Sequence, residues 1–137
     1  MTPHKKEASL YHPVSKYVHR KGFRLQHPEM PFYEYSIDLY GFSRVRHLTV
    51  AVELKLTKWK RAFQQAILYQ LCSDLVYIAM PAAAIRRVDL CLLEQYGIGL
   101  LSVDPTDRCR EILGPVRSEV LSRSYKNAFI ELVRKGT

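Results

Sequence analysis

A glutamate and a lysine two residues apart interrupt an apolar stretch near the middle of the chain. Residues 50–56 read VAVELKL, and Glu53 and Lys55 are their only charged members. Because strand side chains alternate between two faces, these two share one face, and the valines and leucines share the other. Two interpretations are open: a structural ion pair or solvated strand face, or a divalent-metal site in which Glu53 is an oxygen ligand and Lys55 stabilises or deprotonates a bound group.

A second carboxylate is expected beside the first. Residues 32–42 alternate like a strand, residues 41–46 suggest a turn, and residues 50–56 would then return antiparallel to the first strand. Such a hairpin can place Asp38 and Glu53 on one face at neighbouring strand ends. The two carboxylates and the backbone carbonyl of Leu54 are enough for Mg²⁺, which binds few protein oxygens and keeps several waters. With Lys55 as a positive group, this set suits phosphodiester hydrolysis.

A basic amphipathic helix is predicted directly after this strand. Thr57 can cap it, and the helix would run over residues 58–72. The stripe expected to face the sheet consists of Ala62, Gln65, Ala66, Tyr69 and Cys72. The opposite side carries Lys58, Lys60 and Arg61, which form either a nucleic-acid contact or an ordinary solvated helix face. An amide among small apolar residues needs a partner, which points to Gln65 as a site residue, although the adjacent Gln64 is an alternative.

The remaining elements form an α/β pattern that would position these residues. A helix is expected over residues 7–21 with Gly22 as its stop, followed by a short strand over 22–26 that the proline-containing segment 28–31 breaks. After the basic helix we expect a buried strand over 75–80 parallel to its predecessor, a helix over 85–96 ended by Gly97, a strand over 98–103, and a long C-terminal helix spread over 105–137.

Composition limits the class of protein. The 137 residues carry 21 Lys and Arg against 13 Asp and Glu, a net charge of +8, which favours a polyanionic partner such as nucleic acid. Three widely spaced cysteines argue against a zinc site or a disulfide framework. With no apolar run long enough for a membrane span and no signal-peptide pattern, we expect a single cytoplasmic domain, 1–137, that does not use a membrane.

The order of helix, three strands, helix and strand, with Asp38, Glu53-x-Lys55 and Gln65 at their positions, resembles the PD-(D/E)xK nuclease superfamily over about residues 7–104. The resemblance implies that Asp38 and Glu53 hold magnesium, that Lys55 acts beside the attacked phosphate, and that Gln65 supports the site. Gln65-x-x-x-Tyr69 resembles a Gln-x-x-x-Tyr variant found in some branches. Glu7 matches a glutamate that many members place near the metals.

Three stretches, 7–14, 52–56 and 76–81, are similar more narrowly to a group of small uncharacterised bacterial nuclease-like proteins. One departure is that Ile37, rather than proline, precedes Asp38.

The sequence therefore predicts a restriction-endonuclease-like α/β core, α-β-β-β-α-β, with a mixed sheet flanked by helices and an added C-terminal helix. It predicts a nuclease that cuts DNA with Mg²⁺ or Mn²⁺. A homodimer is an open alternative to a monomer, since two copies could address two strands. The rival hypotheses are a nucleic-acid-binding module that keeps the nuclease fold without cutting, and a toxin- or defence-related scaffold whose activity resides in an associated chain.

Overall fold

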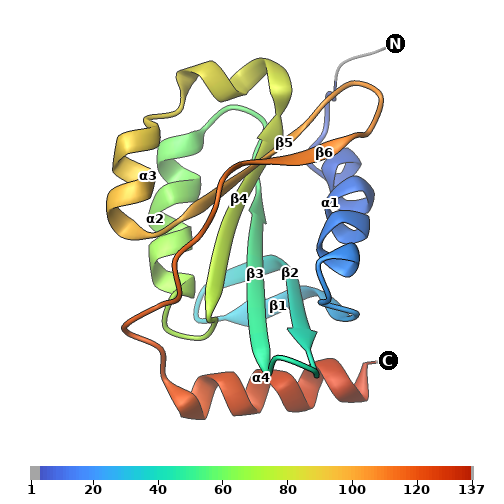
Figure 1. Ribbon diagram of the computed structural model, residues 1–137, viewed down its shortest axis with the longest axis vertical. Helices are drawn as coiled ribbons and strands as arrows, with labels where there is room; N and C mark the ends of the chain where they lie inside the picture. Colours follow the sequence, from blue (N-terminus) through green and yellow to red (C-terminus); the bar gives the residue numbers. More distant parts are fainter. Residues whose placement is uncertain (1–3, 137) are drawn as a thin grey trace.

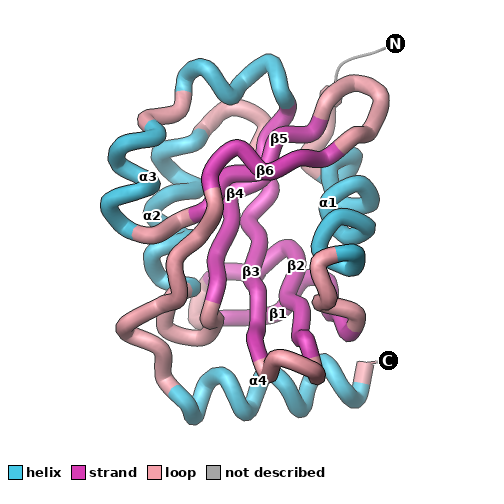
Figure 2. Tube along the Cα trace, viewed as in Figure 1, coloured by secondary structure: helices cyan, strands magenta, loops and turns pink. Residues whose placement is uncertain are grey.

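A six-stranded mixed sheet organises the chain. The computed structural model describes residues 4–136. The strands are β1 (Leu25–Phe32), β2 (Tyr35–Ser43), β3 (Leu48–Leu54), β4 (Leu75–Pro81), β5 (Gly99–Val103) and β6 (Cys109–Leu113). They lie in the sheet in chain order, with β3–β4 and β4–β5 parallel and the other pairs antiparallel (Figures 1 and 2). The predicted mixed α/β architecture is therefore confirmed.

Helices cover both faces of this sheet. Helix α1 (Ala8–Arg20) packs on one face through a cluster that includes Leu10, Val14 and Val18. Helices α2 (Trp59–Tyr69), α3 (Leu90–Tyr96) and α4 (Arg123–Lys135) contribute to the cluster on the other face, and Figure 1 shows α1 and α2 on opposite sides of the strands. Among residues 4–136, no helix combines the length and apolarity needed to cross a membrane.

The alternation predicted for the central strand is present. Val50, Val52 and Leu54 join the cluster beneath α1, whereas Ala51 belongs to the cluster on the α2 side. Glu53 shares the face of Ala51, since side chains two apart in a strand point the same way. The carboxylate therefore lies between the sheet and α2.

The first two strands differ from the prediction. Residues 28–31, expected to break a strand, lie inside β1, and Pro28 and Pro31 are aligned with Leu39 and Ser36 of β2. Proline is tolerated there because β1 is an edge strand and has no neighbour on its other side. The strand expected over 32–42 is instead interrupted by a tight turn at Tyr33 and Glu34, where Tyr33 has a φ of 56°.

The helices after β3 and β4 also have different limits. Helix α2 starts at Trp59 and its N-cap residue, Lys58, makes no side-chain capping bond; Thr57 contributes only its backbone oxygen, which accepts from the Trp59 N–H at 2.9 Å. The helix expected over 85–96 is divided into a 3₁₀ helix, η1 (Ala82–Arg87), and α3. Gly97 ends α3 as predicted, with a φ of 73° that glycine adopts without strain.

The prediction of one long helix from residue 105 is wrong. This part contains β6, then an irregular segment, 114–122, and only then α4, which Ser122 caps. The valines that suggested a helix, Val116 and Val120, are 61% and 57% exposed in the irregular segment. The sheet thus extends beyond the expected core boundary near residue 104.

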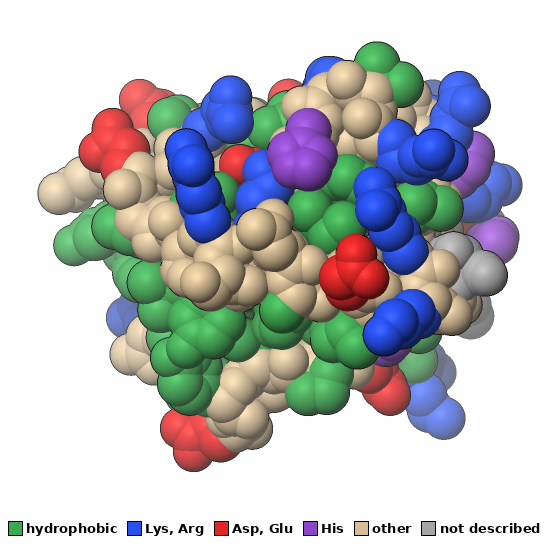
Figure 3. Space-filling model, turned by 90° about the horizontal axis from the view of Figure 1, so that it is seen from below, with side chains coloured by type: hydrophobic (Ala, Val, Ile, Leu, Met, Phe, Trp, Pro, Cys, Tyr) green, Lys and Arg blue, Asp and Glu red, His purple; other side chains and the backbone are tan. Residues whose placement is uncertain are grey.

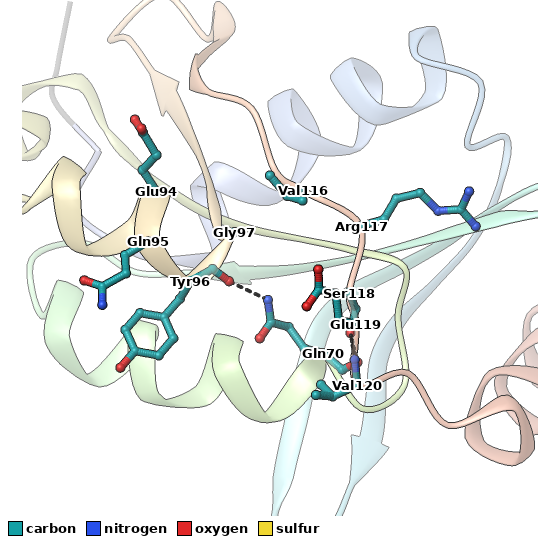
Figure 4. A pocket seen from close by; sticks show the side chains of 10 residues that line it. All are labelled: Gln70, Glu94, Gln95, Tyr96, Gly97, Val116, Arg117, Ser118, Glu119 and Val120. Carbon is teal, nitrogen blue, oxygen red and sulfur yellow. Dashed lines mark hydrogen bonds between the residues drawn. The ribbon is translucent and has the colours of Figure 1, made fainter.

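Segment 114–122 crosses the ends of α2 and α3 beside a cavity of about 300 Å³ (Figure 4). The Ser118 hydroxyl donates to the backbone carbonyl of Gln70 at 2.6 Å, and the Ser118 backbone N–H donates to the backbone carbonyl of Asp74 at 2.8 Å. The side-chain amide of Gln70 donates in turn to the backbone carbonyl of Tyr96 at 2.8 Å. These bonds fix the path of the chain from β6 towards α4.

Helix α4 is attached to the sheet by a buried ion pair. The Lys126 ammonium lies 2.8 Å from the Asp74 carboxylate and also donates to the backbone carbonyl of His47 at 2.9 Å. Asp74 accepts from both the N–H and the hydroxyl of Thr49. Burial alone would raise the pKa of Asp74, but the bonds from Lys126 and Thr49 lower it below its usual value.

Candidate active site

The site begins where β2 and β3 stop pairing. Their aligned register runs from Ser43 and Leu48 to Leu39 and Val52. One residue further, the Asp38 carboxylate accepts a 2.7 Å hydrogen bond from the Leu54 N–H. A side chain has thus taken the place of a neighbouring strand as the acceptor for a backbone donor. This arrangement brings Asp38 to the end of β3, beside Glu53, as the sequence predicted.

Glu53 is almost completely buried, at 4% exposure. One carboxylate oxygen accepts from the Tyr69 hydroxyl at 2.8 Å, and the other lies 3.4 Å from the Lys55 ammonium. Tyr69 is fully buried on the face of α2 that packs against the sheet. The ion pair expected from the structural interpretation of Glu53 and Lys55 is therefore present, but it is held inside the protein.

Burial disfavours the ionised form of both carboxyl groups. Burial, and after it the nearby charge of Asp38, raise the pKa of Glu53 to about 7, although the Tyr69 hydrogen bond and Lys55 act to lower it. Burial also raises the pKa of Asp38, with an added contribution from Glu7, despite the opposing Leu54 N–H bond. Lys55 therefore does not fully offset the burial of the pair, and a further cation near them would favour the ionised form of both carboxyl groups.

Gln65 lies one helical turn before Tyr69 on α2. Its side-chain oxygen is buried and has no hydrogen-bond partner among the described residues. Gln64 is exposed. Both border a surface cavity of about 380 Å³ together with Tyr35, Lys60 and Arg61. Of the two candidate amides, Gln65 is the one whose oxygen is directed into the protein.

Glu7 lies just before α1 and is exposed. It borders a cavity of about 450 Å³ that Asp38 and Leu54 also line. The same cavity includes Tyr11 and Glu29, which the sequence did not single out. Glu29 has a φ of 49° within an edge strand, and no sequence motif indicates that this strand would bring it opposite Asp38.

The three basic residues at the start of α2 are all exposed. Lys60 and Arg61 border the cavity next to Gln65, and the Lys60 ammonium lies 5.9 Å from the centre of the Trp59 ring. Lys58 is the N-cap residue of α2. Two of the three thus border the same cavity as Gln65, and the solvated-face interpretation is still open for all three.

The donor set suits a hard divalent cation. No cluster of three or more His, Cys, Asp or Glu side chains close enough to hold a metal occurs within residues 4–136. Asp38 and Glu53, with the Leu54 carbonyl, nonetheless provide oxygen donors of the kind that Mg²⁺ takes in small number. Burial is the main cause of both raised pKa values, and a cation bound beside the carboxylates would offset that cost by favouring their ionised forms.

Comparisons with known proteins identify the fold but not a family. No family model and no curated protein matches the chain. A solved structure of a protein of unknown function from Silicibacter pomeroyi has a similar fold, with a TM-score of 0.70 and 17% sequence identity over 99% of this chain and 86% of that chain. At this identity the similarity supports the mixed α/β architecture alone.

Proposed function

We propose that this protein is a magnesium-dependent nuclease that hydrolyses phosphodiester bonds of DNA. The observation that carries the proposal is the buried Glu53 beside Asp38 at the parted ends of β2 and β3, with Lys55 next to them. Stability alone gives little reason to bury two repelling carboxylates. A restriction-endonuclease-like core is part of the same proposal, supported by the order helix, antiparallel three-strand unit, helix and parallel strand.

The chemical roles follow from the contacts of each residue. Asp38, Glu53 and the Leu54 carbonyl would hold Mg²⁺ or Mn²⁺, which supplies charge neutralisation and a more acidic water when bound. Lys55 places a positive charge beside the carboxylates, where it can stabilise negative charge developing on a phosphate. Tyr69 orients the Glu53 carboxylate through its 2.8 Å hydrogen bond. The unpartnered oxygen of Gln65 is available to accept a hydrogen bond from an attacking water.

The experiment is a cleavage assay on duplex, single-stranded and branched DNA, and on matching RNA, with Mg²⁺, Mn²⁺ or chelator. We expect cleavage of DNA that disappears with chelator. Asp38→Asn, Glu53→Gln and Lys55→Ala should each lower the rate by about 100-fold or more, because each removes a charge used in the transition state. Glu94→Gln, which changes an exposed carboxyl on α3, is the matched control. Undiminished cleavage by Glu53→Gln would refute the proposal.

The basic start of α2 gives a separate prediction about substrate binding. Replacing Lys58, Lys60 and Arg61 together by glutamate should weaken DNA binding and reduce its dependence on salt, because fewer counterions are released. Fluorescence anisotropy in chelator at several salt concentrations measures this effect. Unchanged binding would assign these residues to an ordinary solvated helix face.

One observation favours the non-catalytic alternative, a nucleic-acid-binding module. The Lys55–Glu53 ion pair and the Asp38–Leu54 bond already satisfy part of the site without any metal. A protein of this kind would bind the DNA panel equally well with and without Mg²⁺ and cut none of it. Sedimentation of the free protein and of the DNA complex would also show whether the protein is a monomer or a homodimer.

A further inference from the structure

Two segments of the chain contain basic residues and no acidic ones. Residues 8–28 lack Asp and Glu, and so do residues 39–52. Their basic members are Lys16, Arg20, Lys21, Arg24, Arg44 and Arg46. Together these residues supply much of the net charge of +8. The sequence does not show whether the two segments meet.

The fold brings part of each segment together at the turn between α1 and β1. Arg46, in the turn between β2 and β3, donates from its guanidinium to the Lys21 oxygen and lies 5.0 Å from the centre of the Phe23 ring. Gly22, with a φ of 105°, allows this approach, since a Cβ there would lie 3.1 Å from the Arg46 guanidinium. Figure 3 shows Lys and Arg side chains gathered on one half of the face that α4 crosses, with acidic side chains sparse among them.

A cavity of about 740 Å³ opens between these two turns. Arg24, Arg44 and Arg46 line it, and its lining includes no Asp or Glu. Arg24 and Arg44 are exposed and make no ion pair with any carboxylate in residues 4–136. We call this feature the basic cavity and define it by its three arginines.

Arginines with no carboxylate partner suit a phosphate. The guanidinium group offers several N–H donors in a planar fork that matches phosphate oxygens, and Arg46 is held in place by contacts that use only part of its donors. A membrane surface fits less well, because the site is concave and Val45, 98% exposed, is the one large apolar side chain at its rim that faces solvent. We propose that the basic cavity binds the phosphodiester backbone of nucleic acid at a position separate from the candidate active site.

The strand register gives the separation. The basic cavity lies at the Ser43 end of β2 and the carboxylates lie at the Asp38 end. Five residues of strand span about 17 Å, at about 3.4 Å per residue. Successive base pairs of B-DNA are also about 3.4 Å apart, so the two positions are about five base pairs apart. The choice of nucleic acid as the ligand rests on the proposed function, and this second contact would hold a substrate to one side of the scissile bond.

The test is binding of a 20-base-pair duplex in chelator, measured by fluorescence anisotropy from low to high salt. Arg24→Ala/Arg44→Ala removes two arginines of the basic cavity and leaves the packed Arg46 intact. Because each phosphate contact contributes about 0.9 to the slope of log affinity against log salt, the double variant should lower that slope by nearly 2. Affinity at low salt should fall by 10-fold or more. Arg108→Ala/Arg110→Ala is the matched control for lost charge, because both side chains are exposed at the opposite edge of the sheet, Arg108 just before β6 and Arg110 within it.

The outcomes separate this inference from the proposed function. Equal affinity and slope for the two double variants would overturn the inference, even if the protein cuts DNA. The inference would also be overturned, in favour of a membrane surface, if Arg24→Ala/Arg44→Ala bound DNA like the native protein but lost binding to anionic phospholipid vesicles. Selective loss of DNA binding by a protein that never cleaves would support the basic cavity and refute only the nuclease proposal.

Discussion

Replacing Glu53 by glutamine should change how the stability of the fold depends on pH. Burial and the Asp38 charge raise the pKa of Glu53 from an ordinary value of 4.5 to about 7 in the folded protein. Between these pH values the unfolded chain loses the Glu53 proton and the folded protein keeps it. The free energy of unfolding therefore falls as pH rises through this window, by about 1.4 kcal/mol per pH unit or about 3 kcal/mol in all.

Glutamine keeps an oxygen that can accept from Tyr69 but has no proton to lose. The stability of Glu53→Gln relative to the native protein should then rise by about 3 kcal/mol between pH 4.5 and pH 8, which corresponds to about 10 °C in melting temperature for a domain of this size. The assay is urea unfolding in chelator across this range. Glu94→Gln, with an exposed carboxyl, should run parallel to the native protein.

Parallel curves for Glu53→Gln and the native protein would refute the claim that Glu53 is an uncompensated buried carboxyl. A difference of opposite sign would show that the ion pair with Lys55 outweighs burial. Mg²⁺ provides the second part of the assay, because an ion that binds only the folded protein stabilises it. Its stabilising effect should be larger at pH 8 than at pH 5.5, since protons compete for the same oxygens, and should be small in Glu53→Gln.

Three further substitutions test one contact of the site and two packing interactions elsewhere in the fold. Tyr69→Phe removes a hydrogen bond that lowers the pKa of Glu53, so the acid limb of the pH–rate profile should move to higher pH; an unmoved limb would mean that Tyr69 only fills space. Lys126→Met leaves the buried Asp74 without its closest cation and should cost about 3 kcal/mol of unfolding free energy, measured by urea titration near pH 7; a cost below about 1 kcal/mol would contradict the role given to this pair. Gly99→Ala should cost about 1–3 kcal/mol in the same titration, because its Cβ would lie 2.7 Å from a tyrosine ring of β4, and a neutral result would show that this ring moves aside easily.

Local patterns predicted the centre of the sheet well. In residues 50–54 large apolar side chains alternate with Ala51 and Glu53, and β4 is a continuous apolar run. Both patterns are typical of buried strands, because strand side chains alternate between two faces and a central strand has both faces covered. The role of Gly97 as a helix stop was equally predictable, since the residue that ends a helix often has a positive φ, which favours glycine. The convergence of Asp38 and Glu53 also followed from simple hairpin geometry.

The departures lie where tertiary context decides. Pro28 and Pro31 occupy a strand because that strand has one neighbour, which the sequence does not show. Strand β6 escaped prediction because it is short and only Cys109 within it is buried. In the site, the bond from the Leu54 N–H to Asp38 depends on how far two strands part, and no spacing rule gives that distance.

Helix α4 has a consequence for how the chain folds during synthesis. Its Phe129 ring lies 5.6 Å from Phe32 and 5.2 Å from Tyr40, centre to centre, although about a hundred residues separate the partners in the chain. Contacts between such distant residues form late, because a long loop must close first. Until residues 123–135 leave the ribosome, the aromatic side of the first hairpin lacks the cover that α4 gives it. The nascent chain should then expose this part of its aromatic surface until α4 docks on it.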